Sequence, residues 1–360
     1  MDQNEKLAQK PPLPVKPLSS PTSFHENDQC REDLNVDKFG FFGGEQYCLA
    51  SPSSDKEDNT DKKVDKWNQM FSNWNDWMLK DYYHLRARCR KGIPMSQRPL
   101  AWQYLCGSYF YIKKYRGEYS TMSLCKCPLE VIDEIQKDTY RQFPNHTYFA
   151  GKGGQGQQAL ARLLRLYAVV RPDVGYSQAQ APIAASLLIH MKEEEAFWTY
   201  LCINEFYLAH YYEHDMEYYG IELLPVCVDW FMCLFTRNLP WDTVLRVLDQ
   251  FFCEGIKVIF RVALAIFELL FEDFRRCSKQ DLDAGTIMMA IRKLPPHIVT
   301  ESVLIPTSLK YVDKITKDEL SSMHIRKREE LYKIREVGPT DNEYYLKTDK
   351  TIVRNSSSKL

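Results

Sequence analysis

The feature that most restricts the fold is a helical hydrophobic periodicity that begins at Trp67 and runs through most of the remaining chain. Runs of alternating β-branched residues, which would indicate strands, are almost absent. Proline and glycine fall between the periodic segments, for example at Gly92, Pro144 and Pro240, as expected at helix ends. The sequence therefore predicts an all-α fold. The expected helices cover residues 65–89, 96–107, 128–143, 156–170, 179–191, 193–212, 223–236, 241–253, 256–276, 281–293 and 316–336.

The polar composition of both ends limits this fold to a single multi-helix domain. Residues 1–63 are charged and proline-bearing, and they carry too little apolar surface to offset the entropy of ordering, so we expect a disordered tail. We expect the helical domain at residues 64–310, a C-terminal helical extension at 311–337 and a polar tail at 338–360.

Short motifs at both ends suggest partners. The segment PPLPVKP, residues 11–17, contains two P-x-x-P frames that fit an SH3-type groove, although a plain solvated tail is the simpler interpretation. The chain ends in Ser358-Lys359-Leu360, which matches both a peroxisomal targeting signal and the carboxyl terminus that a PDZ domain binds. We favour PDZ docking over peroxisomal import, and chance occurrence is the third alternative.

Charge and cysteine usage exclude several classes of protein. The 47 basic and 48 acidic residues give a formal net charge of -1, so no overall field attracts nucleic acid or an anionic membrane. The 11 cysteines are odd in number and scattered through apolar segments, as in a reducing compartment. The N-terminus lacks an apolar core, and the apolar run at 251–271 contains charged residues. We therefore expect a cytoplasmic protein that is peripheral to membranes through its partners.

Three short motifs would point to other functions, and each has a simpler interpretation. GKGGQG at 151–156 matches the dinucleotide-binding pattern, but no strand is predicted before it, so we expect a loop between helices. HYYEH at 210–214 matches a zinc-hydrolase pattern, but position picks out no third ligand. Cys125 and Cys127 are too close together for a zinc knuckle. We expect the chain itself to bind no cofactor.

The segment PLEVIDEIQKDTYRQFP, residues 128–144, presents an arginine. On a helical wheel Arg141 lies roughly opposite an apolar stripe and faces solvent. Asp138 is expected on the same outward side, where it can pair with Arg141 and limit its rotamers. A solvated ion pair is the simpler interpretation, but a held arginine before a glycine-rich loop also suits a phosphate. The stripe comprises Leu129, Ile132, Ile135, Thr139 and Phe143.

A second displayed polar residue lies in GYSQAQAP, residues 175–182. Pro182 fits the first turn of a helix, so Gln178 falls at or just before the helix N-terminus and faces solvent. We assign Gln180 no chemical role beyond hydrogen bonding in the loop or at an interface. The local sequence alone indicates no function for either glutamine.

Five sequence blocks, in order over about residues 90–300, resemble the signature blocks of TBC domains, the Rab GTPase-activating proteins, and more closely the carabin-like subgroup. The resemblance implies an all-α TBC domain in vesicle-traffic regulation that is not itself an enzyme but completes the active site of a Rab GTPase. GTP and Mg²⁺ would be carried by that GTPase. The blocks are KGIPMSQRPLAW (91–102), IQKDTYRQFP (135–144), GYSQAQ (175–180), WFMCLF (230–235) and LPWDTVLRVLDQFFCEG (239–255).

The resemblance also implies roles for individual residues. Arg141 would enter the GTPase site as an arginine finger, and Gln178 would orient the attacking water in place of the GTPase's own glutamine. Asp138 would orient Arg141, while Gly175 and Tyr176 would shape the turn that displays Gln178. The remaining matched positions would support the fold or the GTPase interface, with the tryptophans in the core: Arg98, Trp102, Trp230, Arg246 and Asp249.

Two departures from the family pattern bear on this assignment. Leu248 stands where the family usually has tryptophan, which is a tolerable apolar change. The interval between Gln178 and Trp230 is about one helical hairpin shorter than the family pattern, with the shortfall near residues 211–225. The alternative is therefore a catalytically weak TBC-like binding or scaffold module.

Overall fold

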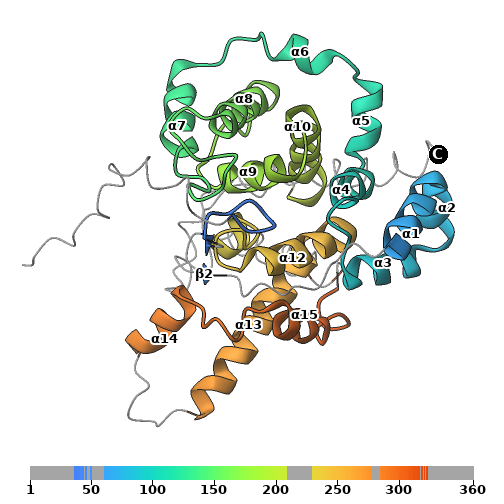
Figure 1. Cartoon of the computed structure of the whole chain (residues 1–360), viewed down its shortest axis with the longest axis vertical. Coiled ribbons are helices and arrows are strands. Elements are labelled where there is room, and N and C mark those ends of the chain that lie inside the picture. The colour runs from blue at the N-terminus through green and yellow to red at the C-terminus, as the bar shows by residue number, and fades with distance from the viewer. Residues whose placement is uncertain are drawn as a thin grey trace, which may run out of the picture.

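Helices account for nearly all the regular structure of the chain (Figure 1). The structure, a computed structural model, describes residues 36–43, 45–46, 49–50, 61–208, 229–276, 284–316, 318, 320 and 322. The predicted all-α class is confirmed, and the described strands are one short antiparallel pair, β1 (Glu45–Gln46) and β2 (Leu49–Ala50). The helices are α1 (Asp61–Ser72), α2 (Trp74–Lys80), α3 (Tyr82–Lys91), α4 (Arg98–Cys106), α5 (Ser108–Lys114), α6 (Glu118–Met122), α7 (Leu129–Thr139), α8 (Gln155–Val170), α9 (Gln180–His190), α10 (Glu193–Cys202), the π-helix η1 (Ile203–Tyr207), α12 (Trp241–Glu254), α13 (Lys257–Arg276), α14 (Ala284–Arg292) and α15 (Glu301–Leu309).

The helices form two groups on either side of a shared core. Figure 1 shows α5 to α10 in the upper half and α12 to α15 in the lower half, with α1 to α3 at one side. Helix α9 packs against α8 and α10, and α12 packs against α3, α4, α13 and α15. Residues 180–188 of α9 are all buried, as expected for a helix that is apolar on every side.

Two of the predicted helices are interrupted by residues that leave helical dihedrals. The helix expected over 65–89 is three helices, because Asn73 and Asp81 leave helical dihedrals, with φ of -129° and -133°. Short amide and carboxylate side chains compete with the backbone and favour such breaks. The helix expected over 223–236 is helical at 229–232, and the buried residues Leu234 and Phe235 then adopt left-handed φ values of 49° and 60°.

Several sequence-based predictions fall outside the described residues. They concern the P-x-x-P segment at 11–17, HYYEH at 210–214, the shortened interval at 211–225, and the C-terminal Ser-Lys-Leu. Most of the helix expected over 316–336 also lies outside them. Leu208 and Trp230, which border the shortened interval, are both buried.

The apolar run at 251–271 forms the end of α12 and most of α13, and it contains a buried charge cluster. The Glu254 carboxylate accepts hydrogen bonds from Arg90 at 2.6 and 2.7 Å and from Arg261 at 2.9 Å. These two guanidinium groups lower the pKa of Glu254 against the opposing effect of burial, which raises it. In the part of the chain that the structure describes, no helix is long and apolar enough to span a bilayer.

Residues 36–43 pack on the core although they lie within the predicted disordered tail. Phe41 is 1% exposed, and its ring centroid lies 5.4 Å from that of Trp241 and 4.8 Å from that of His146. The Phe42 N–H donates to the Asn145 carbonyl at 2.8 Å. The prediction of disorder does not hold for these residues, because one aromatic side chain docks in a site that composition does not reveal.

Replacing Phe41 by alanine should reduce the free energy of unfolding by about 1.5–3 kcal/mol, the value of burying a phenylalanine side chain. Urea unfolding of Phe41→Ala, with Phe271→Ala as a control at a 53% exposed position, would measure this. Equal losses in the two variants would mean that the docked segment contributes no stability.

Candidate functional site

Arg141 lies in the turn that follows α7. The helix ends at Thr139, four residues earlier than the end predicted from the sequence. Phe143 has a left-handed φ of 44° and buries its ring, whereas the Arg141 side chain is 50% exposed. Within the turn, Gln142 Nε2 donates to the Asp138 carbonyl at 3.1 Å. The arginine therefore projects from a turn that is held in place by the buried Phe143 ring and by the hydrogen bond from Gln142 to Asp138.

The Asp138 carboxylate connects this turn to the loop that carries Gln178. Its Oδ1 accepts a hydrogen bond from Arg141 Nη2, which gives the predicted pair, and its Oδ2 accepts one from the Tyr176 hydroxyl at 2.7 Å. Asp138 is only 5% exposed, so the prediction that it faces outward was wrong. Local periodicity could not reveal this burial, because the covering residue, Tyr176, comes from a distant part of the chain.

The Tyr176 hydroxyl is held in its donating form. Burial raises the pKa of Tyr176, and the positive charge of Arg141 only partly opposes this effect. The phenol is therefore protonated at neutral pH and donates to Asp138. An ionised carboxylate that accepts from both an arginine and a phenol has strong, charge-assisted partners on both oxygens.

The loop from Gly175 to Ala179 displays Gln178 as predicted. Gly175 has a left-handed φ of 64°, which permits the reversal before α9. Gln178 is exposed, whereas Gln180 is fully buried and its Nε2 donates to the Gly175 carbonyl at 3.4 Å. Pro182 lies in the first turn of α9, where a missing N–H costs no hydrogen bond. Gln178 is therefore displayed at the surface, whereas Gln180 is buried at the start of α9 and hydrogen-bonds to the loop.

Asp249 anchors α4 to α12 in the core. Its carboxylate accepts from Arg98 Nε at 2.9 Å and Nη2 at 3.1 Å, from Trp102 Nε1 at 3.0 Å and from the Ile93 N–H at 2.9 Å. Arg98 is 2% exposed and Asp249 0%. This ion pair supports the fold and presents no surface to a partner. Both tryptophans expected in the core, Trp102 and Trp230, are fully buried, and Leu248 is also buried.

Arg246 closes the C-terminal end of α3. Its Nη1 and Nη2 donate to the carbonyls of Lys91 and Arg90, each at 2.7 Å. Gly92 has φ of 97°, and a Cβ atom there would lie 2.1 Å from Arg246 Nη1. Arg246 is therefore also a buried structural residue, and glycine at position 92 leaves room for its guanidinium.

The other motifs lie in ordinary helical surroundings. Residues 151–154 form the loop before α8, and Gln155 and Gly156 begin the helix. A Cβ atom at Gly156 would lie 2.4 Å from the Tyr148 carbonyl oxygen, so the glycine is needed for packing. A helix, not a strand, precedes this loop, as predicted. Cys125 and Cys127 are free thiols. Among the described residues, no cluster of three or more His, Cys, Asp or Glu side chains could hold a metal ion.

Sequence reasoning missed one exposed residue beside the arginine. Tyr140 precedes Arg141 and is 56% exposed. Tyrosine and arginine are among the side chains most enriched at the energetic centres of protein interfaces. An aromatic residue at the polar end of a helix, directly before an outward arginine, is the signal that could have identified it.

The fold and this pair of residues define a helical domain that displays an arginine and a glutamine at its surface. The family model of the Rab-GTPase-TBC domain matches residues 95–223 and 206–274. The chain belongs to this family. The match consists of two segments that overlap at residues 206–223, the region in which the shortened interval was predicted.

Individual relatives agree with the predicted subgroup. TBC1 domain family member 10B of Mus musculus is 40% identical over 298 residues, which cover 75% of this chain and 37% of that protein. Carabin of Mus musculus is 35% identical over 298 residues, covering 74% and 66%. The chain thus spans little more than a third of the length of the first relative. A solved structure, the Chlamydomonas flagellar RabGAP TBC domain, is 26% identical with a TM-score of 0.56 and covers 76% of this chain and 99% of that domain.

Proposed function

We propose that the chain is a GTPase-activating protein for a Rab-type small GTPase, to which it supplies Arg141 and Gln178. The GTPase would carry GTP and Mg²⁺, and this chain would complete its active site without binding a cofactor of its own. Such a regulator would act in vesicle traffic. It would be cytoplasmic and would associate with membranes only through its partners. SH3 and PDZ domains are proposed as further partners of residues 11–17 and of the C-terminus.

The chemistry requires little covalent participation by the activator. Negative charge on the transferred phosphoryl group is spread over its oxygens in the transition state, and catalysis consists mainly of positioning and electrostatic stabilisation. The planar guanidinium of Arg141 can donate two parallel hydrogen bonds to such oxygens. The amide of Gln178 can accept from and donate to a water molecule, as the orientation of a nucleophile requires.

The shared carboxylate of Asp138 is the observation that carries the proposal. Fixing a free arginine side chain costs about 1.5–2 kcal/mol of rotamer entropy. The bond to Asp138 meets part of this cost before a partner arrives, and the Tyr176 hydroxyl couples the same carboxylate to the loop of Gln178. The turn of the half-exposed arginine and the loop of the exposed glutamine are thus held together by the hydrogen bonds of Asp138 to Arg141 and Tyr176, which suits two groups that must act together.

Gln178→Ala should lower the single-turnover rate of stimulated GTP hydrolysis on the order of 10²-fold, as for the loss of one preorganised polar group at a reacting centre. Wild-type protein would first be assayed against a panel of Rab proteins to find the cognate GTPase. Gln180→Ala, at the buried first residue of α9 whose side chain donates to the Gly175 carbonyl, is the control for damage to the loop.

The assay also separates the two candidate functions. A wild-type protein that binds a Rab protein but does not accelerate hydrolysis would be a binding module, and the proposal would fail. An active wild type whose rate is unchanged by Gln178→Ala would remove the glutamine from the mechanism.

A further inference from the structure

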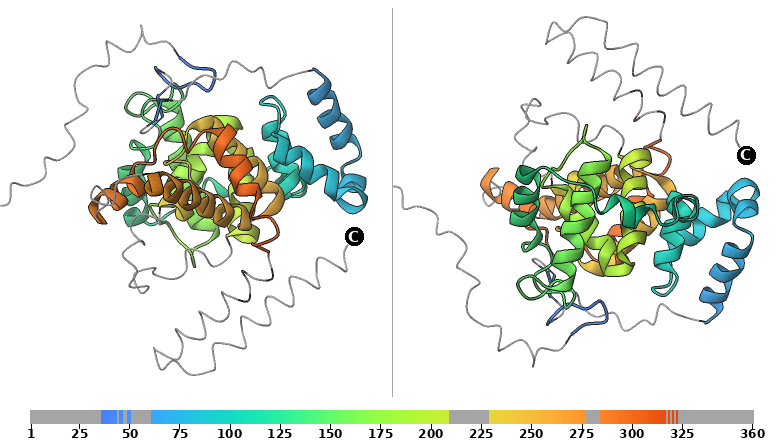
Figure 2. Two further views of the ribbon diagram at one scale, coloured as in Figure 1. Left: turned by 90° about the horizontal axis from the view of Figure 1, so that it is seen from below. Right: turned by 90° about the horizontal axis from the view of Figure 1, so that it is seen from above.

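The docked segment at residues 36–43 lies against the loop that follows α7. Figure 1 and both views of Figure 2 show this segment, drawn in blue, beside the green loop. The Phe42 N–H donates to the Asn145 carbonyl at 2.8 Å. The Thr147 N–H donates to the Gly40 carbonyl, also at 2.8 Å. Two backbone hydrogen bonds therefore tie the segment to the residues that follow the arginine turn.

His146 adds a side-chain hydrogen bond between the same two parts of the chain. Its Nδ1 accepts the Tyr148 N–H at 3.1 Å, so its Nε2 carries the proton and donates to the Phe39 carbonyl at 2.9 Å. Gly40 has φ of 96°, and a Cβ atom there would lie 2.7 Å from His146 Nε2. The contact is therefore close enough that a side chain larger than that of glycine cannot be accommodated at position 40 without displacing the segment or the imidazole.

Asp37 shapes the docked segment locally. Its Oδ1 accepts the N–H groups of Phe39 and Phe41 at 2.9 and 2.8 Å, and its backbone carbonyl accepts the Gly40 N–H at 3.0 Å. An aspartate that hydrogen-bonds the backbone of its own turn fixes that turn by local contacts. The segment therefore presents Phe41 from a preformed turn, which reduces the entropy lost when the ring docks.

Phe143 connects the docked segment to Arg141, which lies two residues earlier. A left-handed φ of 44° is unfavourable for a residue with a Cβ atom, so Phe143 keeps it only while surrounding contacts hold the turn. The Phe143 ring contacts three others, with centroid distances of 6.1 Å to Phe41, 5.3 Å to Trp241 and 6.0 Å to Phe149. Removing Phe41 would open this cluster and weaken the contacts that fix the turn.

We propose that the docked segment positions Arg141 for the partner GTPase, with Phe41 as the positioning residue. This role rests on the proposed function, in which Arg141 is the arginine finger. The Asp138 carboxylate limits the arginine side chain, whereas the docked segment fixes the backbone that follows it. Both constraints matter because a misplacement of about 1 Å at a catalytic group can cost on the order of 10²-fold in rate.

Single-turnover GTP hydrolysis with saturating amounts of the full chain tests the proposal. Phe41→Ala should lower the maximal rate by about 10- to 100-fold, because the arginine is no longer held in register. The concentration that gives half-maximal stimulation should stay within about threefold of wild type, since binding is not the step that is lost. Gly40→Ala should have the same effect, because its Cβ atom would displace the segment while the Phe41 ring is kept.

Two further measurements separate positioning from a loss of stability. Hydrogen exchange at the Thr147 amide should be faster in both variants, because that N–H donates to the docked segment, while the core amides of α12 stay protected. Affinity for the GTPase bound to GDP and aluminium fluoride, a transition-state analogue, should fall at least tenfold. Affinity for the GTPase bound to a non-hydrolysable GTP analogue should stay within about threefold of wild type. A loss of folded protein would lower both affinities equally.

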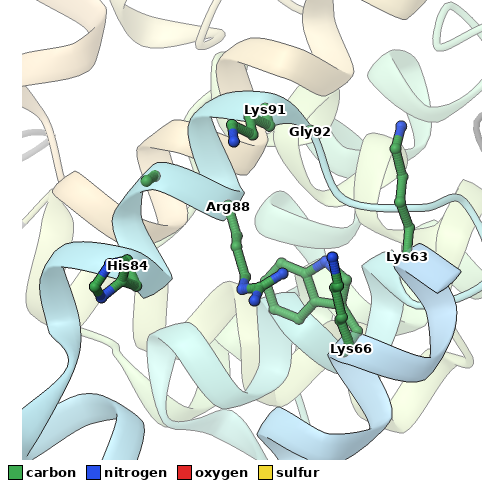
Figure 3. Close-up of a pocket in the computed structure, with 8 residues that line it drawn as sticks. Lys63, Lys66, His84, Arg88, Lys91 and Gly92 are labelled. Carbon is green, nitrogen blue, oxygen red and sulfur yellow. The ribbon is translucent and has the colours of Figure 1, made fainter.

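Val36→Ala and Lys66→Gln are the controls. Val36 belongs to the docked segment, but its side chain is 47% exposed. Lys66 is exposed on α1, at the other side of the molecule (Figure 2), beside a cavity of about 340 Å³ between α1 and α3 (Figure 3). Both variants should stimulate hydrolysis at the wild-type rate, which would show that a change in this N-terminal part of the chain is not by itself enough to slow the reaction.

The outcomes distinguish this role of Phe41 from the proposed function. An active wild type, with maximal rates within about twofold of it in both Phe41→Ala and Gly40→Ala, would overturn the positioning role and leave the proposed function intact. Equal losses of affinity for the two nucleotide states would also overturn it, because the segment would then contribute stability alone. A wild type that accelerates hydrolysis on no Rab protein would refute the proposed function and the positioning role together.

Discussion

Replacing Arg141 by alanine should abolish most of the acceleration of GTP hydrolysis, a loss on the order of 10³- to 10⁵-fold for an arginine supplied in trans. The side chain is half exposed, and Asp138 keeps its hydrogen bond from the Tyr176 hydroxyl, so we expect the folded state to lose little stability. Arg141→Lys should recover only a small part of the rate, because an ammonium cannot reproduce the planar fork. Single-turnover hydrolysis with the cognate GTPase measures both variants.

Arg116→Ala is the control, since Arg116 is an exposed arginine between α5 and α6. The Arg116→Ala variant should stimulate GTP hydrolysis by the GTPase at the wild-type rate. Complex formation with the GTPase in a non-hydrolysable GTP state should survive in Arg141→Ala within about tenfold. A variant that binds and still accelerates hydrolysis at more than a tenth of the wild-type rate would exclude Arg141 as the arginine finger.

Asp249→Ala should destabilise the domain by about 3–5 kcal/mol, the cost of removing one partner from a buried ion pair. The change leaves the 2% exposed Arg98 with an uncompensated charge. It also leaves the N–H groups of Trp102 and Ile93 without their acceptor. Urea or thermal unfolding measures the loss, and the effect on hydrolysis should follow the folded fraction.

Asp76→Ala provides the matched control, because Asp76 forms an exposed i,i+4 pair with Lys80. Such pairs contribute about 0–1 kcal/mol. If Asp249→Ala were no more destabilising than Asp76→Ala, the buried network would not hold α4 against α12. A double-mutant cycle with Arg98→Leu would separate the pair from its other hydrogen bonds.

Helix periodicity predicted most of the fold, and it failed where tertiary contacts override local preference. Helices α8, α9, α12 and α13 lie within about one residue of their predicted limits, because a glycine or proline lies at or within two residues of the start of each. Helix α15 was missed because Pro306 lies inside it. Helices α5 and α6 were missed because they are only 7 and 5 residues long, and so short a segment shows too few turns to establish a period.

The candidate site was predictable to a smaller extent. Local reasoning placed Arg141 and Gln178 at the surface, and only the family resemblance joined them into one site. The bond between Tyr176 and Asp138 links residues 38 positions apart, and no local pattern encodes it. For Arg98, Arg246 and Asp249 the resemblance left open a role in the fold or at the interface, and their burial favours the fold.

The docked segment at residues 36–43 has a practical consequence for recombinant work. Phe41 covers the ring of Trp241 and contacts Phe143, two residues after the arginine. A protein fragment that begins at residue 64, or at residue 95 where the family match starts, would leave this aromatic surface bare to solvent and prone to self-association. Fragments for crystallisation or kinetic assays should therefore begin before Val36, so that the measured activity is that of the complete domain.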